Sequence, residues 1–242
     1  IMGRALVSYY QATHQPRILE ALNKVYSRYT MLSPTNQKRL ESGLVRGSTN
    51  VDAMTETFLE NGNKTILDSI IAYSNRPLVR QFGQRIMQMS DRSHKGFKTT
   101  HGVTFYEVSR VPAISSIWNG REEDRDVSLH LLSWAGKYNM LPLGLVSCDI
   151  PASMWNYTWQ MRIDGKGQWG DRIENVFFNA GPVSVSRDWK TMSYYQMPNR
   201  FSEKLPADPA VPGPGDQRYT PYGHEVLCCV GSSNWEIPNY VT

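Results

Sequence analysis

FLENGNKTILDSII, residues 58–71, reads as the end of one helix, a short polar turn and the start of a second helix. Asn61, Gly62 and Asn63 are residue types that favour turns. The segments on either side, 50–59 and 65–73, carry apolar residues at helical spacing. Asn75 and Pro77 are typical of the end of the second helix. This stretch therefore predicts a helical hairpin.

The same outline occurs twice more along the chain. YYQATHQPRILEAL (9–22) and IWNGREEDRDVSLHLL (117–132) each join an aromatic or apolar helix end to a second apolar helix through a polar turn. In the first of them, Pro16 marks the break between two helices within residues 2–30. This recurrence predicts stacked helical hairpins, as in an α-solenoid or a helical barrel. An ordinary helical bundle with similar loops is the alternative, because the period is irregular.

The pattern changes after about Trp155. Residues 169–180 still have helical spacing, whereas residues 182–195 contain alternating and β-branched residues. We predict a short β-hairpin there that turns at Arg187 and Asp188. Residues 205–223 are rich in proline and glycine and predict a loop. The sequence therefore predicts a mostly α-helical fold with a small β element near the C-terminus.

Composition narrows the possible function classes. The chain has 242 residues and a net charge of +4, and the absence of a long run of like charges argues against a nucleic-acid-binding arm. No apolar stretch approaches the ~18 residues that a membrane span needs. The 13 Tyr and 7 Trp suit a carbohydrate or another polyhydroxyl ligand, although helix packing accounts for them equally well. The N-terminal segment reads as the middle of a helix and not as a secretion signal, and the sequence decides neither the compartment nor the oligomeric state.

Three cysteines are candidates for metal binding or nucleophilic chemistry: Cys148, Cys228 and Cys229. They do not make a disulfide framework, and a disulfide between two adjacent cysteines is strained. On an irregular turn, Cys228 and Cys229 can both reach one zinc ion, with Cys148 as a third ligand. Three unrelated buried cysteines are the alternative, since no CxxC spacing is present.

Two other side chains could contact a ligand. His101 lies in a threonine-rich turn before a predicted helix, where it could donate to a hydroxyl group, act as an acid or base, or cap the helix. Glu174 lies one helical turn after Asp171 and could bind a sugar hydroxyl or remain a solvated charge. The sequence has no motif for a nucleotide cofactor or a serine hydrolase.

Two C-terminal stretches resemble glycoside hydrolase family 127 and its relatives, the β-L-arabinofuranosidase-like proteins. The stretches are 148–201, which begins CDIPASMWNYTWQ, and HEVLCCVGSSNWEIPNYV (224–241). The specific elements are Cys148-Asp149-Ile150, Gly170-Asp171-Arg172-Ile173-Glu174, Asn179-Ala180, Tyr195 with Pro198-Asn199, and Cys228-Cys229 with Gly231 and Pro238-Asn239-Tyr240-Val241. The match spans nearly the whole chain, but upstream of Cys148 it is looser.

The resemblance implies that residues 1–242 form a single, partial (α/α)6 barrel, which a β-sandwich would follow in a full-length protein. It implies a retaining glycosidase that acts on an arabinose-containing glycan or a related sugar. In the family, zinc is held by one Glu and three Cys, and the first Cys of the adjacent pair is the nucleophile. By this match Cys228 is the nucleophile, and Cys148 and Cys229 are its zinc co-ligands. His101, Glu174 and Tyr195 match positions that line the family's sugar pocket.

The sequence departs from the family at the remaining zinc ligand. Val146 stands where the family has a Glu, and no carboxylate occurs between Asp126 and Asp149. The family's general acid/base Glu is therefore missing as well. Either a segment is absent from this sequence, or the protein has lost hydrolysis and kept the scaffold. We expect a glycoside hydrolase, and the alternative is a non-catalytic helical barrel that binds carbohydrate or is stabilised by zinc.

Overall fold

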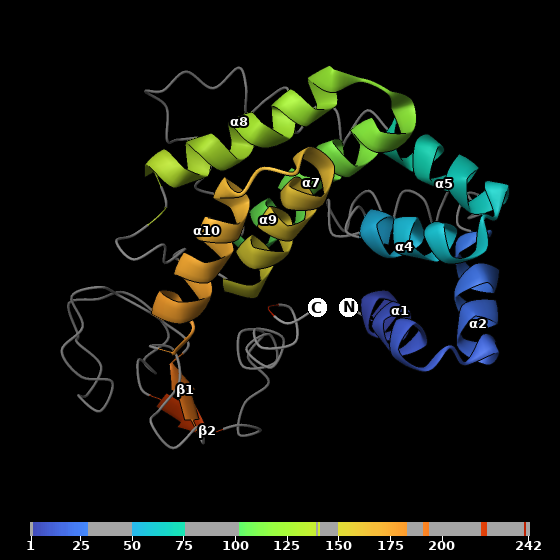
Figure 1. Ribbon diagram of the computed structural model, residues 1–242, viewed down its shortest axis with the longest axis horizontal. Helices are drawn as coiled ribbons and strands as arrows, with labels where there is room; N and C mark the ends of the chain where they lie inside the picture. Colours follow the sequence, from blue (N-terminus) through green and yellow to red (C-terminus); the bar gives the residue numbers. More distant parts are fainter. Residues whose placement is uncertain are drawn as a thin grey trace. The chain divides into compact units, whose positions relative to one another are not determined.

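The computed structural model describes residues 2–28, 50–75, 102–138, 140, 150–182, 191–193, 219–221 and 240. It divides into two compact units, residues 1–133 and residues 134–242. The described residues are mostly α-helical, which confirms the prediction of a mostly α-helical fold (Figure 1).

Unit 1 consists of paired helices, as the recurring sequence outline predicts. The pairs are α1 (Met2–Thr13) with α2 (Pro16–Tyr26), α4 (Val51–Asn61) with α5 (Lys64–Ser74), and α7 (Gly102–Asn119) with α8 (Glu122–Tyr138), whose last residues belong to unit 2. In Figure 1, α1/α2 and α4/α5 are seen as neighbouring hairpins, and helices of the two pairs contact each other. The three hairpins expected from the sequence are therefore confirmed.

A left-handed residue ends the first helix of every pair. His14, Gly62 and Gly120 have φ values of 52°, 65° and 68°. In each case the backbone N–H of this residue donates to the carbonyl four residues earlier, at 2.7 Å, 2.7 Å and 3.0 Å respectively. This bond satisfies a carbonyl that the helix end would otherwise leave unpaired. Only one further residue then separates the left-handed residue from the next helix, so the chain reverses within a corner of two residues.

Side-chain hydrogen bonds tie the α4/α5 corner to the preceding pair. The Asn61 and Asn63 amides donate to Oδ1 of Asn23, near the end of α2, at 3.1 Å and 2.6 Å. Asn61 Oδ1 accepts the backbone N–H of Asn63, and Asn63 Oδ1 caps α5 by accepting from Thr65 N at 2.9 Å. The corner is thus fixed both internally and against α2.

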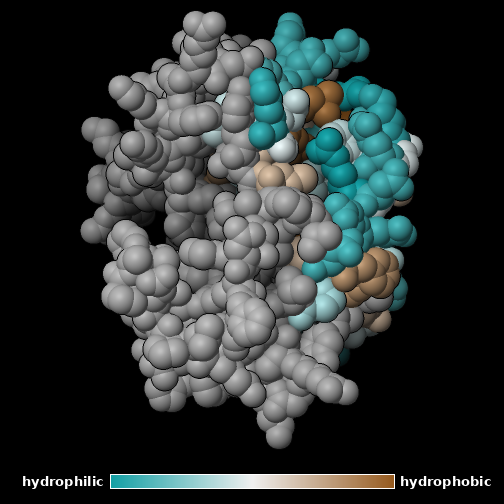
Figure 2. Space-filling model, turned by 90° about the vertical axis from the view of Figure 1, so that its left-hand side faces the viewer, coloured by the Kyte–Doolittle hydropathy of each residue, from teal (hydrophilic) through white to brown (hydrophobic). Residues whose placement is uncertain are grey.

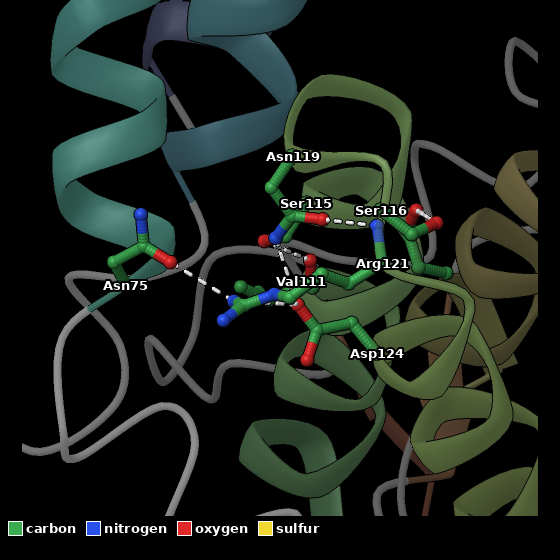
Figure 3. Close-up of polar contacts among 8 residues, drawn as sticks. Asn75, Val111, Ser115, Ser116, Asn119, Arg121 and Asp124 are labelled. Carbon is green, nitrogen blue, oxygen red and sulfur yellow. Dashed lines mark hydrogen bonds and ion pairs between the residues drawn. The ribbon is translucent and has the colours of Figure 1, made fainter.

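The α7/α8 corner repeats this arrangement with different side chains (Figure 3). Arg121 donates through Nη2 to Oδ1 of Asn75, at the end of α5, at 2.9 Å. Its Nη2 also lies 2.8 Å from Asp124 Oδ2, and its backbone N–H donates to Asn119 Oδ1. The side-chain amide of Asn119 also donates to Asp124 Oδ2, at 2.8 Å. Each of these two corners is therefore anchored on an asparagine at the end of the preceding pair.

The core of unit 1 lies between neighbouring pairs, where α1 packs against α4 and both α4 and α5 pack against α7. Trp118 crosses from α7 to α4, where its indole N–H donates to Thr55 at 3.2 Å and its ring packs edge-on against Phe58. The fully buried apolar residues include Val51, Met54, Ile66, Ile70, Val111 and Ile114. Burial of these side chains supplies the main driving force for the stacking.

Unit 2 contains a further helix pair and a short β-ladder. Helix α9 (Ile150–Asp164) packs against α10 (Gln168–Asn175), and Gly165, with a φ of 67°, begins the corner between them. Helix α10 continues into a π-helical turn, η5 (Val176–Ala180), so residues 169–180 are helical as predicted. Strands β1 (Thr191–Ser193) and β2 (Tyr219–Pro221) pair antiparallel.

The β-ladder differs in part from the sequence-based prediction. The hairpin predicted to turn at Arg187 and Asp188 lies outside the described residues at that turn. The described strand from this segment pairs with residues 219–221, a partner far along the chain. The prediction of a continuous loop over residues 205–223 is therefore wrong at Tyr219–Pro221, because period and composition do not reveal a distant strand partner. None of the helices in the described ranges is long and apolar enough to cross a membrane.

Candidate functional site

Most residues of the predicted site lie outside the described part of the chain. These are the three cysteines Cys148, Cys228 and Cys229, together with His101 and Tyr195. Glu174 is the exception and lies near the end of α10, where its side chain is exposed. The described residues contain no group of three or more His, Cys, Asp or Glu side chains that could hold a metal ion. The three predicted ligands Cys148, Cys228 and Cys229 would offer three thiolates, which are a donor set that zinc accepts.

An aromatic cluster follows Glu174 within one helical turn. Phe177 and Phe178 belong to η5, and Tyr240 stacks on the Phe177 ring with a centroid distance of 4.1 Å and an interplanar angle of 2°. Phe178 packs edge-on against both of the other rings and is 58% exposed. We call Phe177, Phe178 and Tyr240 the aromatic cluster.

The aromatic cluster joins two segments that are far apart in the sequence. Glu174 and Phe177 lie in the first of the two stretches that resemble the glycosidase family, and Tyr240 lies in the second. A π-helical turn inserts one extra residue per turn and often occurs at a functional site. The turn rotates the residues that follow Glu174 relative to a regular α-helix. Both stretches therefore meet at one place in unit 2.

A buried tyrosine lies at the contact between α9 and α10. The ring of Tyr157 stacks on Trp169 at 6.0 Å, and the Arg172 guanidinium lies 5.7 Å from the Tyr157 ring and 5.2 Å from the Trp169 ring. Burial raises the pKa of Tyr157 above its ordinary value, and the Arg172 charge and hydrogen bond oppose this rise. The phenol therefore stays neutral and acts as a packing and hydrogen-bonding group.

The corner between α9 and α10 is held by Asp164. Its Oδ1 accepts the Trp169 indole N–H at 2.8 Å and the Lys166 backbone N–H at 3.0 Å. Trp169 is 3% exposed, so this bond satisfies an indole donor that packing has removed from water. The two bonds fix the entry of α10 and, through it, the direction of Glu174 and η5.

Unit 1 contains a buried group of charges that the sequence analysis did not single out. Asp52, in the first turn of α4, has its Oδ2 2.7 Å from Arg4 Nε of α1 and 3.2 Å from Arg110 Nη2 of α7. The exposed fractions of these side chains are 1% for Asp52, 11% for Arg4 and 0% for Arg110. The three residues, which we call the charge cluster, join the first helices of all three pairs.

Sequence reasoning missed both the aromatic cluster and the charge cluster. The adjacent aromatic residues Phe177 and Phe178 were a visible signal, but Tyr240 as their partner was not. In the sequence, nothing distinguishes Asp52 from any other acidic residue in a first helical turn. On the face drawn in Figure 2, the described residues are mostly hydrophilic, with hydrophobic residues in small separate groups.

Comparisons with known proteins add no family assignment. No protein-family model, no curated protein and no solved structure matches the chain.

Proposed function

We propose that this chain is the catalytic part of a retaining glycoside hydrolase of the β-L-arabinofuranosidase type. The sequence elements around Cys148, Glu174 and Cys228 support this proposal, as does the succession of helix pairs, which is compatible with part of an (α/α)6 barrel. The observation that carries it is the stacking of Phe177 on Tyr240. This contact joins the two sequence stretches on which the resemblance rests.

In this proposal Cys228 is the nucleophile and Cys148 and Cys229 bind zinc beside it. Zinc held by thiolates would keep the Cys228 sulfur deprotonated at neutral pH. The Cys228 thiolate attacks the anomeric carbon, a carbon–sulfur bond forms, and the bond to the leaving oxygen breaks, with the leaving oxygen taking a proton from solvent. Water then attacks the same carbon and gives up a proton to solvent, the thiolate leaves, and the sugar is released with its original anomeric configuration.

The sugar is oriented by His101, Glu174 and Tyr195. Glu174 suits this role because its carboxylate is exposed on α10 and can accept from sugar hydroxyls. Its position is fixed by the Asp164–Trp169 hydrogen bond at the start of the helix and by η5 at the end. The aromatic residues that follow Glu174 offer an apolar surface beside it.

A non-catalytic protein is the second candidate, and one sequence observation favours it. Val146 occupies the position where the family has a zinc-binding Glu, and no carboxylate occurs between Asp126 and Asp149. A glycosidase without a general acid would lose about 10²- to 10⁴-fold in rate. In that case the helix pairs would bind carbohydrate or fold around zinc without hydrolysing a substrate.

Metal analysis together with one substitution tests the proposal. The purified chain should contain about one zinc per molecule, and a metal-free protein with freely titrating thiols would exclude the zinc site. Turnover of an aryl β-L-arabinofuranoside should be lost in Cys228→Ser, while full activity in this variant would exclude Cys228 as the nucleophile. A protein that binds zinc but does not turn over the arabinoside would support the non-catalytic candidate.

A further inference from the structure

Arg110 is a buried cation with unused hydrogen-bond donors. It lies in the middle of α7, and its side chain is 0% exposed. Within the described residues, Arg110 forms an ion pair with Asp52, whose Oδ2 lies 3.2 Å from Nη2. Within the described part of the chain, Nε, Nη1 and Nη2 of Arg110 are all buried without a hydrogen-bond partner. A guanidinium is always charged in proteins, so this burial needs compensation.

Asp52 supplies only part of that compensation, because both of its oxygens also serve other donors. Oδ2 is 2.7 Å from Arg4 Nε, which is the shorter of its two ion-pair contacts. Oδ1 accepts the backbone N–H of Ala53 at 2.7 Å. Arg110 therefore shares a carboxylate that is closer to another guanidinium, and its Nε and Nη1 have no hydrogen-bond partner in the described part of the chain.

We propose that Arg110 binds a small monovalent anion in the interior of unit 1, either a halide or a carboxylate of formate size. Positive charge selects an anion, and a single guanidinium with spare donors matches a single negative charge. Small size follows from the surroundings. The nearby residues Tyr106, Val108, Val111 and Ile114 of α7 are at most 1% exposed, so the surroundings of the guanidinium are close-packed and suit only a small ligand.

This anion site is independent of the proposed glycosidase chemistry. The predicted nucleophile Cys228, the predicted zinc ligand Cys148 and the predicted sugar contact Glu174 belong to unit 2, whereas Arg110 belongs to unit 1. The anion acts as an internal counter-ion for the charge cluster. Its binding makes the stability of unit 1 depend on anion concentration, because a ligand that binds only the folded chain stabilises it.

Thermal unfolding of the full chain in different sodium salts tests the site. At equal ionic strength, chloride and formate should raise Tm in a saturable way, by about 5–10 °C at a hundredfold excess over Kd. Gluconate, which is too large for the interior, should give no such rise. A response to chloride alone identifies a halide site, and a response to formate alone identifies a carboxylate site. Identical curves in all three salts would overturn the proposal.

Arg110→Met keeps most of the side-chain volume and removes the charge. This variant should lose the difference between chloride and gluconate, whereas Arg17→Met, which changes an exposed arginine of α2, should keep it. Retention of the difference in Arg110→Met would assign the anion effect to another site. If Arg110→Met does not fold, line broadening of ³⁵Cl in the magnetic resonance spectrum of the unaltered chain replaces it. Broadening that bromide reverses supports the site, and unbroadened chloride rules out a halide site.

Discussion

Nε of Arg4 lies 2.7 Å from Oδ2 of Asp52, and this ion pair joins two helices, α1 and α4, that belong to different hairpins. Asp52 is almost completely buried, and Arg110 reaches the same oxygen from α7. A carboxylate in this position joins three helices through one atom. Removal of its charge would leave two guanidiniums without their shared partner.

The first prediction concerns this carboxylate. Asp52→Asn preserves the shape of the side chain, and it should lower the free energy of unfolding by about 3–5 kcal/mol because a buried pair is broken. Urea denaturation of the purified variant measures the change. Asp68→Asn alters an exposed carboxylate of α5 and should stay within about 0.5 kcal/mol of the unaltered protein. Equal stability of both variants would contradict a stabilising role for the charge cluster.

The second prediction concerns the corner between α7 and α8. Gly120 has a φ of 68°, so Gly120→Ala should lower stability by about 1–2 kcal/mol through backbone strain alone. An added Cβ meets no atom within 4 Å, which excludes a clash as the cause. Gly136→Ala is the matched control, since Gly136 lies inside α8 with equally open space. Gly136→Ala should raise the free energy of unfolding by about 0.5–1 kcal/mol. A lower free energy of unfolding in this control would show that an added Cβ meets an obstacle in these helices.

The third prediction concerns the contact of α1 with α2. A Cβ on Gly3 would lie 2.0 Å from the Tyr26 hydroxyl oxygen, and Tyr26 is buried. Gly3→Ala should therefore cost about 1–3 kcal/mol through overpacking. Tyr26→Phe removes the obstructing oxygen, so the double variant should be more stable than the sum of the two single changes predicts. Strict additivity in this cycle would exclude the close contact.

The fourth prediction concerns the pH dependence of stability. Burial raises the pKa of Tyr157 in the folded chain, whereas a tyrosine in the unfolded chain has a pKa of about 10. The contribution of the neutral Tyr157 phenol to stability is present in full below the pKa of the unfolded chain and is lost as the pH rises through the pKa of the folded chain. The reason is that the unfolded chain releases the phenol proton at a lower pH than the folded chain does. Tyr157→Phe should therefore lose less stability between about pH 9 and pH 11 than the unaltered protein. Tyr9→Phe, at a side chain that is 47% exposed, provides the comparison.

The fifth prediction concerns the proposed sugar contact. Glu174→Gln should raise KM for an aryl β-L-arabinofuranoside by about 10- to 100-fold, the effect of losing a charged hydrogen bond. Tm should not change, because the side chain is exposed. Asp171→Asn, one turn earlier on the same helix and also exposed, should leave KM unchanged. An unaltered KM in Glu174→Gln would remove this residue from the site.

The helix pairs were predictable because their signals are local. Asn61-Gly62-Asn63 contains both the left-handed residue and the capping side chain of its corner, and Gly120 is the left-handed residue of the α7/α8 corner. His14 occupies the equivalent position without being a glycine, a choice that composition alone would not reveal. Pro16 at the start of α2 indicated that corner instead.

Contacts between distant segments were not predictable. Asp52 pairs with residues of two other helices, and Tyr240 stacks on a ring more than one element away in the chain. Neither contact leaves a periodic trace in the sequence. The pairing of residues 191–193 with residues 219–221 is of the same kind. Glu174 was identified through the resemblance, and its exposed position on α10 follows from the helix, not from the motif.

The corners of two residues have a consequence for the order of folding. Each corner brings helices that are adjacent in the chain into contact, so a hairpin forms with little loop-closure entropy. Contacts of this kind are made early and quickly, as in other proteins of low contact order. The ion pairs of Asp52 with Arg4 and Arg110 connect different hairpins and can form only after the hairpins have docked. Variants at the corners should therefore change the rate of folding, while variants at Asp52 should mainly change the rate of unfolding.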